Sequence, residues 1–212
     1  MHVAAVNLGQ PRAVPGKPGK QSGIYKATVQ RIEVGVLGVE GDAVVDRRHH
    51  GGPSKAVCCY PGQHYDSWRE RFPAASWEPG TFGENLTLSG IDEAGVCLGD
   101  IWQIGEALAQ VSQPRIPCGT LEARVGIRGF VGICLAAGHT GWYLRILRPG
   151  AVVAGLPIEL RRAHPAGLTV AEANRVLHGG QAGAAEVDAL LAVDTLADSW
   201  RESLAKLRAR LG

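Results

Sequence analysis

Two short stretches of the sequence hold the residues best suited to chemistry. Residues 41–57 read GDAVVDRRHHGGPSKAV and place basic side chains on both sides of a glycine turn. Residues 114–121 read PRIPCGTL and place Cys118 three positions after Arg115. Clustered basic groups suit an anion, and a thiolate suits nucleophilic attack or a soft metal. From its residues alone, the first stretch could be a metal site, an anion cradle or a charged surface loop.

The glycine turn at 51–52 is the feature that would make the first stretch an anion cradle. Glycine adopts positive φ without strain, so that consecutive N–H groups can point at one anion. The basic residues that would supply the charge are Arg47, Arg48, His49 and Lys55. The acids Asp42 and Asp46 would orient these groups. The P-loop pattern GxxxxGK[ST] does not occur, so a nucleoside triphosphate is not indicated.

Cys118 stands in a different setting from the other four cysteines. Pro114 and Pro117 cannot continue a central strand, so the chain leaves the sheet there, and a helix is expected to open at Thr120. Helix N–H groups and Arg115 would then lower the pKa of the Cys118 thiol. A structural cysteine at a strand–helix junction is the alternative.

Other chemistries for Cys118 have weaker support. A papain-like pairing with His49, His64 or His139 lacks a protease signature around the cysteine. A zinc site with His49 and His50 is disfavoured, because adjacent residues of an extended chain point to opposite faces. The remaining cysteines lie in apolar sequence, where buried thiols are expected: Cys58, Cys59, Cys97 and Cys134.

The composition is that of an ordinary globular protein. Of 212 residues, 45% are hydrophobic and 20% are charged, which suits one medium domain with a small appendage. A net charge of +2 is too small for a general nucleic-acid binder. The opening MHVAAVNLGQ shows no secretory signal, and no apolar run is long enough for a membrane span. A cytoplasmic location with reduced cysteines is therefore expected.

Short strand-like segments with frequent glycine and proline predict a mainly β, barrel-like domain with short helices over residues 1–163. The clearest expected elements are strands at 24–34, 142–147 and 156–162, a hairpin at 101–113 with its turn at Gly105–Glu106, a helix at 61–72 and a mobile loop at 15–23. Alternation in the third strand predicts that Leu156, Ile158 and Leu160 share its apolar face.

Residues 164–212 change in character and predict a small three-helix domain. The segments expected to be helical are 169–178, 184–193 and 196–211. Thr169 and Glu172 form a capping-box pattern at the start of the first, and Trp200 lies on the apolar stripe of the last. We expect this domain to dock a partner or a second copy of the chain.

Taken in order, five blocks of the sequence resemble the MOSC-domain family, named for the C-terminal domain of molybdenum-cofactor sulfurase. The blocks are GDAVVDRRHHGGPSKAV (41–57), the aromatic segment from Tyr60 to Trp68, PGTFGENL (79–86), GDIWQIG (99–105) and QPRIPC (113–118). The stand-alone bacterial YiiM-like group, with its appended small helical domain, is the most similar. The resemblance covers nearly the whole chain and implies a barrel-like β fold with a cleft for the molybdenum–pterin cofactor.

The resemblance also implies roles for particular residues. Cys118 matches the family's functional cysteine, which ligates molybdenum in reductase members and carries sulfur as a persulfide in sulfurase-type members. The residues expected to bind the phosphate-bearing anionic cofactor (molybdopterin) are Arg47, Arg48, His49, Gly51, Gly52, Lys55, Asn85 and Arg115. Apart from the resemblance, we expect Asp42 to support the basic cluster and His139, in the glycine-flanked loop GHTG, to act as a proton donor near the cleft, with an ordinary surface-loop histidine as the alternative.

The implied activity is reduction of small N-hydroxylated compounds, such as hydroxylaminopurines, to amines. Electrons would come from a separate flavin-containing reductase, and a homodimer is a further expectation. A sulfur carrier with a persulfide on Cys118 and a non-catalytic cofactor-binding module remain as alternatives. After the cysteine, relatives usually have a bulky residue and a lysine, whereas this sequence has Gly119 and Thr120. This departure leaves the substrate open.

Overall fold

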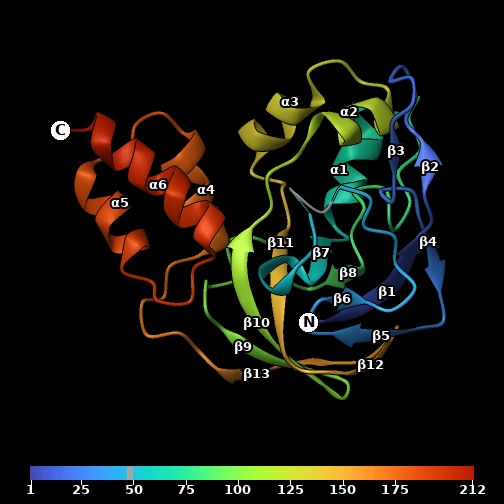
Figure 1. Cartoon of the computed structure of the whole chain (residues 1–212), viewed down its shortest axis with the longest axis horizontal. Coiled ribbons are helices and arrows are strands. Elements are labelled where there is room, and N and C mark those ends of the chain that lie inside the picture. The colour runs from blue at the N-terminus through green and yellow to red at the C-terminus, as the bar shows by residue number, and fades with distance from the viewer. Residues whose placement is uncertain (47–49) are drawn as a thin grey trace.

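The structure is a computed structural model that describes residues 1–46 and 50–212, and one large curled sheet forms its centre (Figure 1). The strands of this sheet are β1 (His2–Gly9), β4 (Lys26–Val29), β7 (Val57–Pro61), β8 (Leu86–Ser89), β9 (Ile101–Ile104), β10 (Ala107–Pro114), β11 (Trp142–Arg148) and β13 (Ile158–Arg162). Their order is β13-β9-β10-β11-β7-β8-β1-β4. β7 and β8 pair in parallel, and β10 pairs antiparallel with both β9 and β11. The sheet is therefore mixed.

The sheet curls until its two ends approach each other. The N–H of Val3 in β1 donates to the carbonyl of Leu156 at 2.9 Å, and the N–H of Gly155 donates back to Val3 at 2.7 Å. A further bridge joins His2 to Pro157, just before β13. The two smaller sheets consist of β12 (Gly150–Val153), β5 (Arg31–Gly35) and β6 (Gly38–Val39), and of β2 (Arg12–Ala13) with β3 (Gln21–Ser22). The expected barrel-like, mainly β fold is confirmed.

Helices gather in two places in Figure 1. Three short helices lie together at one end of the sheet, and three more form a separate group at its flank. The bounds are α1 (His64–Arg71), α2 (Gly119–Val125), α3 (Phe130–Ala137), α4 (Val170–His178), α5 (Ala184–Leu191), α6 (Asp198–Arg210) and the 3₁₀ turn η1 (Pro53–Lys55). The capping box of α4 is present, since the N–H of Glu172 donates to Thr169 Oγ1 at 3.1 Å. The expected helices of the C-terminal segment are thereby confirmed.

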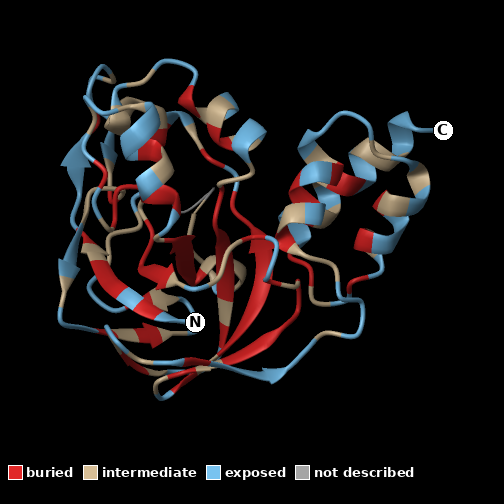
Figure 2. Ribbon diagram, turned by 180° about the vertical axis from the view of Figure 1, so that it is seen from behind, coloured by how far each residue is buried: buried red, intermediate tan, exposed pale blue. Residues whose placement is uncertain are grey.

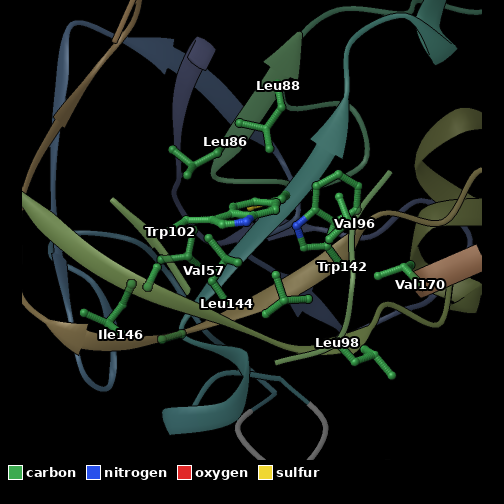
Figure 3. Close-up of a cluster of buried hydrophobic side chains, with 14 of the residues drawn as sticks. Val57, Leu86, Leu88, Val96, Leu98, Trp102, Trp142, Leu144, Ile146 and Val170 are labelled. Carbon is green, nitrogen blue, oxygen red and sulfur yellow. The ribbon is translucent and has the colours of Figure 1, made fainter. Parts of the chain in front are cut away.

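The flanking helices share their hydrophobic core with the sheet. One continuous cluster of buried side chains includes Trp102 and Trp142 of the sheet and Val170, Leu190 and Trp200 of the helices. Trp102 and Trp142 meet edge to face, with ring centroids 6.1 Å apart, and Val170 lies at the edge of the same cluster (Figure 3). Figure 2 shows buried residues, in red, both in the sheet and in the helical group beside it. The three-helix group is thus packed onto the barrel.

A second, aromatic cluster lies beneath α1, α2 and α3. Its buried members are Tyr60, Tyr65, Trp68, Trp77, Phe82, Leu121, Phe130 and Cys134. Tyr60 and Phe82 stack with centroids 3.8 Å apart, and Leu121 in the first turn of α2 is fully buried. This cluster therefore anchors the helix that begins directly after Cys118.

Several details differ from the sequence-based expectations. The segment 24–34 is two strands, β4 in the main sheet and β5 in a small one, because the chain changes sheets at Gln30. In β13, Ile158 is buried but Leu160 is 50% exposed, because β13 ends the sheet and its solvent-facing side is largely exposed. Cys97 is half-buried, whereas Cys58, Cys59 and Cys134 are buried as expected.

The segment 15–23 forms the turn of the β2–β3 hairpin. Lys17 at its tip donates from Nζ to the carbonyl of Gly119 at 2.9 Å. A Cβ atom on Gly119 would lie 3.4 Å from that same nitrogen. The hairpin is therefore tied to the first residue of α2, next to Cys118.

Replacing Trp200 tests whether the helical group and the barrel are one folding unit. Its side chain is 1% exposed, and its indole N–H donates to the carbonyl of Pro114 at 3.0 Å. Trp200→Ala should lower the free energy of unfolding by about 3–5 kcal/mol, because it leaves a cavity and an unpaired carbonyl. Urea denaturation followed by circular dichroism measures this. Arg210→Ala, at the exposed end of the same helix, is the control and should change stability little.

Candidate functional site

The two stretches singled out in the sequence meet at one cavity. Its volume is about 810 Å³ when the open solvent at its mouth is included. The expected site residues that line it are Gly51, Lys55, Asn85, Arg115 and Cys118. Other lining residues include Lys26, Asp42, Asp46, His50, Cys58, Thr120 and Tyr143. Gly52 instead lines a neighbouring groove beside the β5–β6 turn, while Arg47, Arg48 and His49 lie outside the described residues.

Cys118 is the N-cap residue of α2 and is half-buried in the cavity wall. Burial raises the pKa of its thiol, because it penalises the charged form. A hydrogen bond with His50, the charge of Arg115 and the N–H groups of Leu121 and Thr120 outweigh burial and lower the pKa to about 6. At neutral pH the sulfur is therefore predominantly a thiolate, as the sequence predicts.

Arg115 supplies fixed positive charge close to this sulfur. Its guanidinium donates to the carbonyl of Phe82 at 2.6 Å and to that of Thr140 at 3.5 Å, and it lies 5.8 Å from the centre of the Phe82 ring. Burial lowers its pKa, but the nearby groups Cys58, Tyr143 and Cys118 reverse the effect and leave it raised. Arg115 thus remains charged, and two of its donors are already used by the protein.

The loop from His50 to Lys55 forms a second wall of the cavity. Gly51 and Gly52 have φ values of 73° and 79°, a region that favours glycine. Ser54 anchors the loop to the sheet: its carbonyl accepts from Ser112 at 2.6 Å, and its hydroxyl accepts from Arg145 at 3.0 Å. Burial lowers the pKa of Lys55 in this wall. A fixed loop therefore presents a lysine and a glycine to the cavity.

Asn85 and Asp42 belong to one buried network. Asn85 Oδ1 accepts the N–H of Cys58 at 3.1 Å, and Asn85 Nδ2 donates to Asp42 Oδ2 at 2.9 Å. The second oxygen of Asp42 accepts the N–H of Gly9 at 2.7 Å. The Asp42 carboxylate also forms a salt bridge with Lys26. Asp42 thus pairs with a lysine of β4 that the sequence reasoning missed.

The expected site did not include four residues that line the wall, namely Lys26, His50, Cys58 and Tyr143. His50 was set aside in favour of His49, although it is His50 that bonds Cys118. Tyr143 and Cys58 lie opposite each other on β11 and β7, a pairing that only the sheet topology reveals. For Lys26, the signal available was a lone lysine in the apolar-rich strand IYKATV.

His139 does not line the cavity. Its ring stacks on that of His64, with centroids 3.6 Å apart, and meets Trp68 edge to face. Burial, followed by the proximity of His64, lowers the pKa of His139. His64 in turn pairs with Glu93 at 2.7 Å. The position of His139 fits a side chain that packs behind the cavity wall.

The chemistry of the donor set fits an anionic, metal-bearing cofactor. Within residues 1–46 and 50–212 no cluster of three or more His, Cys, Asp or Glu side chains could hold a bare metal ion. A single thiolate can, however, complete the coordination of a metal whose other ligands arrive with a cofactor. Lys26, Lys55 and Arg115 provide positive charge around Cys118 for an anionic group. No helix in the described part of the chain has the length and apolarity to cross a membrane.

Comparisons with known proteins agree with this fold and site. The MOSC domain matches residues 46–159, and the YiiM-like 3-alpha helix domain matches residues 168–210. This chain therefore belongs to the MOSC-domain family, in its YiiM-like form. It is 37% identical to the uncharacterized protein YflK of Bacillus subtilis (99% of this chain, 95% of that protein) and 36% identical to YiiM of Escherichia coli (96% and 91%).

Two further comparisons bear on structure and activity. The crystal structure of YiiM from Geobacillus stearothermophilus superposes with a TM-score of 0.83 at 32% identity, covering 100% of this chain and 99% of that one. A protein named "Reductase" from Gibberella moniliformis is 35% identical over 55% of this chain and 21% of its own length.

Removing His50 should weaken the thiolate at Cys118. In His50→Ala, burial continues to raise the pKa of Cys118, but the hydrogen bond that opposes it is lost. The rate of iodoacetamide alkylation should therefore reach half its maximum near pH 6 in the wild type and at clearly higher pH in the variant. His2→Ala, an exposed histidine, is the control and should follow the wild-type profile. Superimposable profiles for His50→Ala and the wild type would contradict the assigned hydrogen bond.

Proposed function

We propose that this protein binds the molybdenum cofactor in the cavity and reduces small N-hydroxylated compounds, such as hydroxylaminopurines, to amines. The observation that carries the proposal is the Cys118 thiolate, with a pKa near 6, in a cavity lined by Lys26, Lys55 and Arg115. Membership of the MOSC family supports a function related to this cofactor. The fungal relative named "Reductase" supports reduction as the reaction class.

Different residues of the chain would bind different parts of the cofactor. Cys118 would ligate molybdenum through its thiolate, and Arg115 would keep that sulfur ionised and attract the anionic cofactor with its charge. Lys55 and Gly51 would hold the anionic part of the cofactor. When bound, the molybdenum centre would supply the two-electron change that cleavage of an N–O bond requires. Arg47, Arg48 and His49 are proposed to complete the anion cradle.

Asn85 would act indirectly. Both ends of its amide are engaged by Cys58 and Asp42, so it would shape the wall that faces the cofactor. His139, which lies behind the wall, would not serve as the proton donor. The proton for the departing oxygen would then come from a residue of the wall itself.

The electron donor and the cellular location are also part of the proposal. We propose a separate flavin-containing reductase as the donor, acting in the cytoplasm, where thiols such as Cys118 stay reduced. Residues 1–163 would form the catalytic domain, and residues 164–212 would form a domain that supports it and docks the donor or a second copy. The match of two separate family domains supports this division.

Sulfur transfer is the second candidate function. The same low pKa of Cys118 would make it a good persulfide carrier, since the thiolate is the reactive form. In that case, incubation with a cysteine desulfurase and cysteine should add one sulfur atom to Cys118, as seen by mass spectrometry. Molybdenum would then be absent from protein made in a host that loads other molybdoenzymes.

The deciding measurement compares the metal content of the wild type with that of Cys118→Ala. Protein from a host that makes the molybdenum cofactor should contain near-stoichiometric molybdenum in the wild type and little in the variant. Reduction of hydroxylaminopurine with a chemical reductant should follow the same pattern. Cys97→Ala, a half-buried cysteine outside the cavity, is the matched control and should keep both. Equal molybdenum and activity in Cys118→Ala would contradict the proposal.

A further inference from the structure

The wall of the cavity contains a buried ion pair, Lys26 with Asp42. Both side chains are only 6% exposed, and both line the cavity. Burying two charges costs several kcal/mol of desolvation, which a salt bridge alone often fails to offset. A charged pair that is kept in a cavity wall despite this cost is therefore a candidate for a functional role.

Asp42 is held rigidly by the barrel. One carboxylate oxygen accepts the N–H of Gly9 at 2.7 Å, and the other accepts Asn85 Nδ2 at 2.9 Å as well as the ammonium of Lys26. The backbone of Lys26 is fixed too, because β4 pairs with β1 at Gly9. The ammonium group thus has one position relative to the cavity.

The ammonium of Lys26 has donors to spare. It carries three N–H donors, and within the described residues its side-chain hydrogen bond goes to Asp42. Since the side chain is almost fully buried but lines the cavity, its other donors can reach a ligand there and are shielded from bulk water. Lys20, at the rim of the same cavity, is exposed.

We propose that Lys26 is a catalytic residue that donates the proton which leaves with the oxygen of the substrate's N–O bond. This inference rests on the proposed function. The overall change is R–NH–OH + 2e⁻ + 2H⁺ → R–NH₂ + H₂O. The N–O bond breaks, the oxygen takes one proton from the Lys26 ammonium and departs as water, and the amine nitrogen takes the second proton from solvent. The electrons would come from the external reductant, the bound cofactor would supply the two-electron chemistry, and Lys26 would then regain a proton from solvent.

Other groups of the wall are less suited to this step. Arg115 remains charged throughout, and two of its donors are bound to carbonyls. His50 is engaged with Cys118. Tyr143 is a poor acid, because burial and the nearby Cys58 raise the pKa of its phenol. Lys26 alone among these combines a charged proton donor with a fixed, shielded position.

The test compares Lys26→Met and Lys26→Arg with the rim control Lys20→Met, all isolated from a host that makes the molybdenum cofactor. Lys26→Arg keeps the charge and the contact to Asp42, so folding should be retained, but a guanidinium does not release its proton. Both Lys26 variants should lose at least about 100-fold in kcat for hydroxylaminopurine reduction, with KM within about two-fold of the wild type. Lys20→Met should match the wild type.

Readouts other than turnover separate this role from the alternatives. Molybdenum content and the dissociation constant of the amine product, measured by calorimetry, should change little in Lys26→Arg. Loss of molybdenum from Lys26→Arg and Lys26→Met would show that Lys26 holds the cofactor, and full activity of Lys26→Arg would show a purely electrostatic role. Either result overturns the proposal while leaving the proposed function intact. A wild-type protein that contains its full molybdenum but does not reduce hydroxylaminopurine would contradict both this proposal and the proposed function.

Discussion

A single buried guanidinium is the interaction on which the rest of the site depends. Arg115 is 5% exposed, and its guanidinium donates to carbonyls of two distant segments, at Phe82 and Thr140. A buried charge costs several kcal/mol unless such partners are held in place. The fold must therefore keep both segments fixed for Cys118 to remain a thiolate.

The turn at Thr140 shows how the fold meets this requirement. The carboxylate of Glu93 accepts the N–H groups of Thr140 at 2.9 Å and Gly141 at 2.7 Å, while Asn174 of α4 donates to Thr140 Oγ1 at 2.8 Å. Trp200 of α6 meanwhile bonds Pro114, the residue before Arg115. The helical group thus supports the arginine from two sides, so its role in the protein includes maintaining the site.

The helices, the strands and the chemistry of single residues could be predicted from the sequence. The contacts between residues far apart in the chain could be predicted less well. The Gly105–Glu106 turn, the capping box at Thr169 and the helix after Cys118 follow from local rules of backbone conformation and hydrogen bonding. The parallel pairing of β7 with β8 and the closure of β1 onto 155–158 depend on contacts between distant residues. Local pattern does not encode these contacts.

The same difference between local patterns and long-range contacts applies to the candidate site. Cys118 and Arg115 are three residues apart, and their chemical relation could be predicted from that spacing. Lys26 could not be placed with Asp42, because their pairing depends on the register of β4 with β1 and on the turn that carries Asp42. Likewise, nothing local distinguishes His50 from its neighbour as the partner of the sulfur.

The tie between Lys17 and Gly119 has an evolutionary consequence. This chain brings a lysine from 102 positions away into the space beside the glycine that follows the cysteine. Positions 17 and 119 should therefore vary together, since a large side chain at one of them displaces the other. A large side chain introduced at position 119 would then need a matching change in the hairpin that carries Lys17.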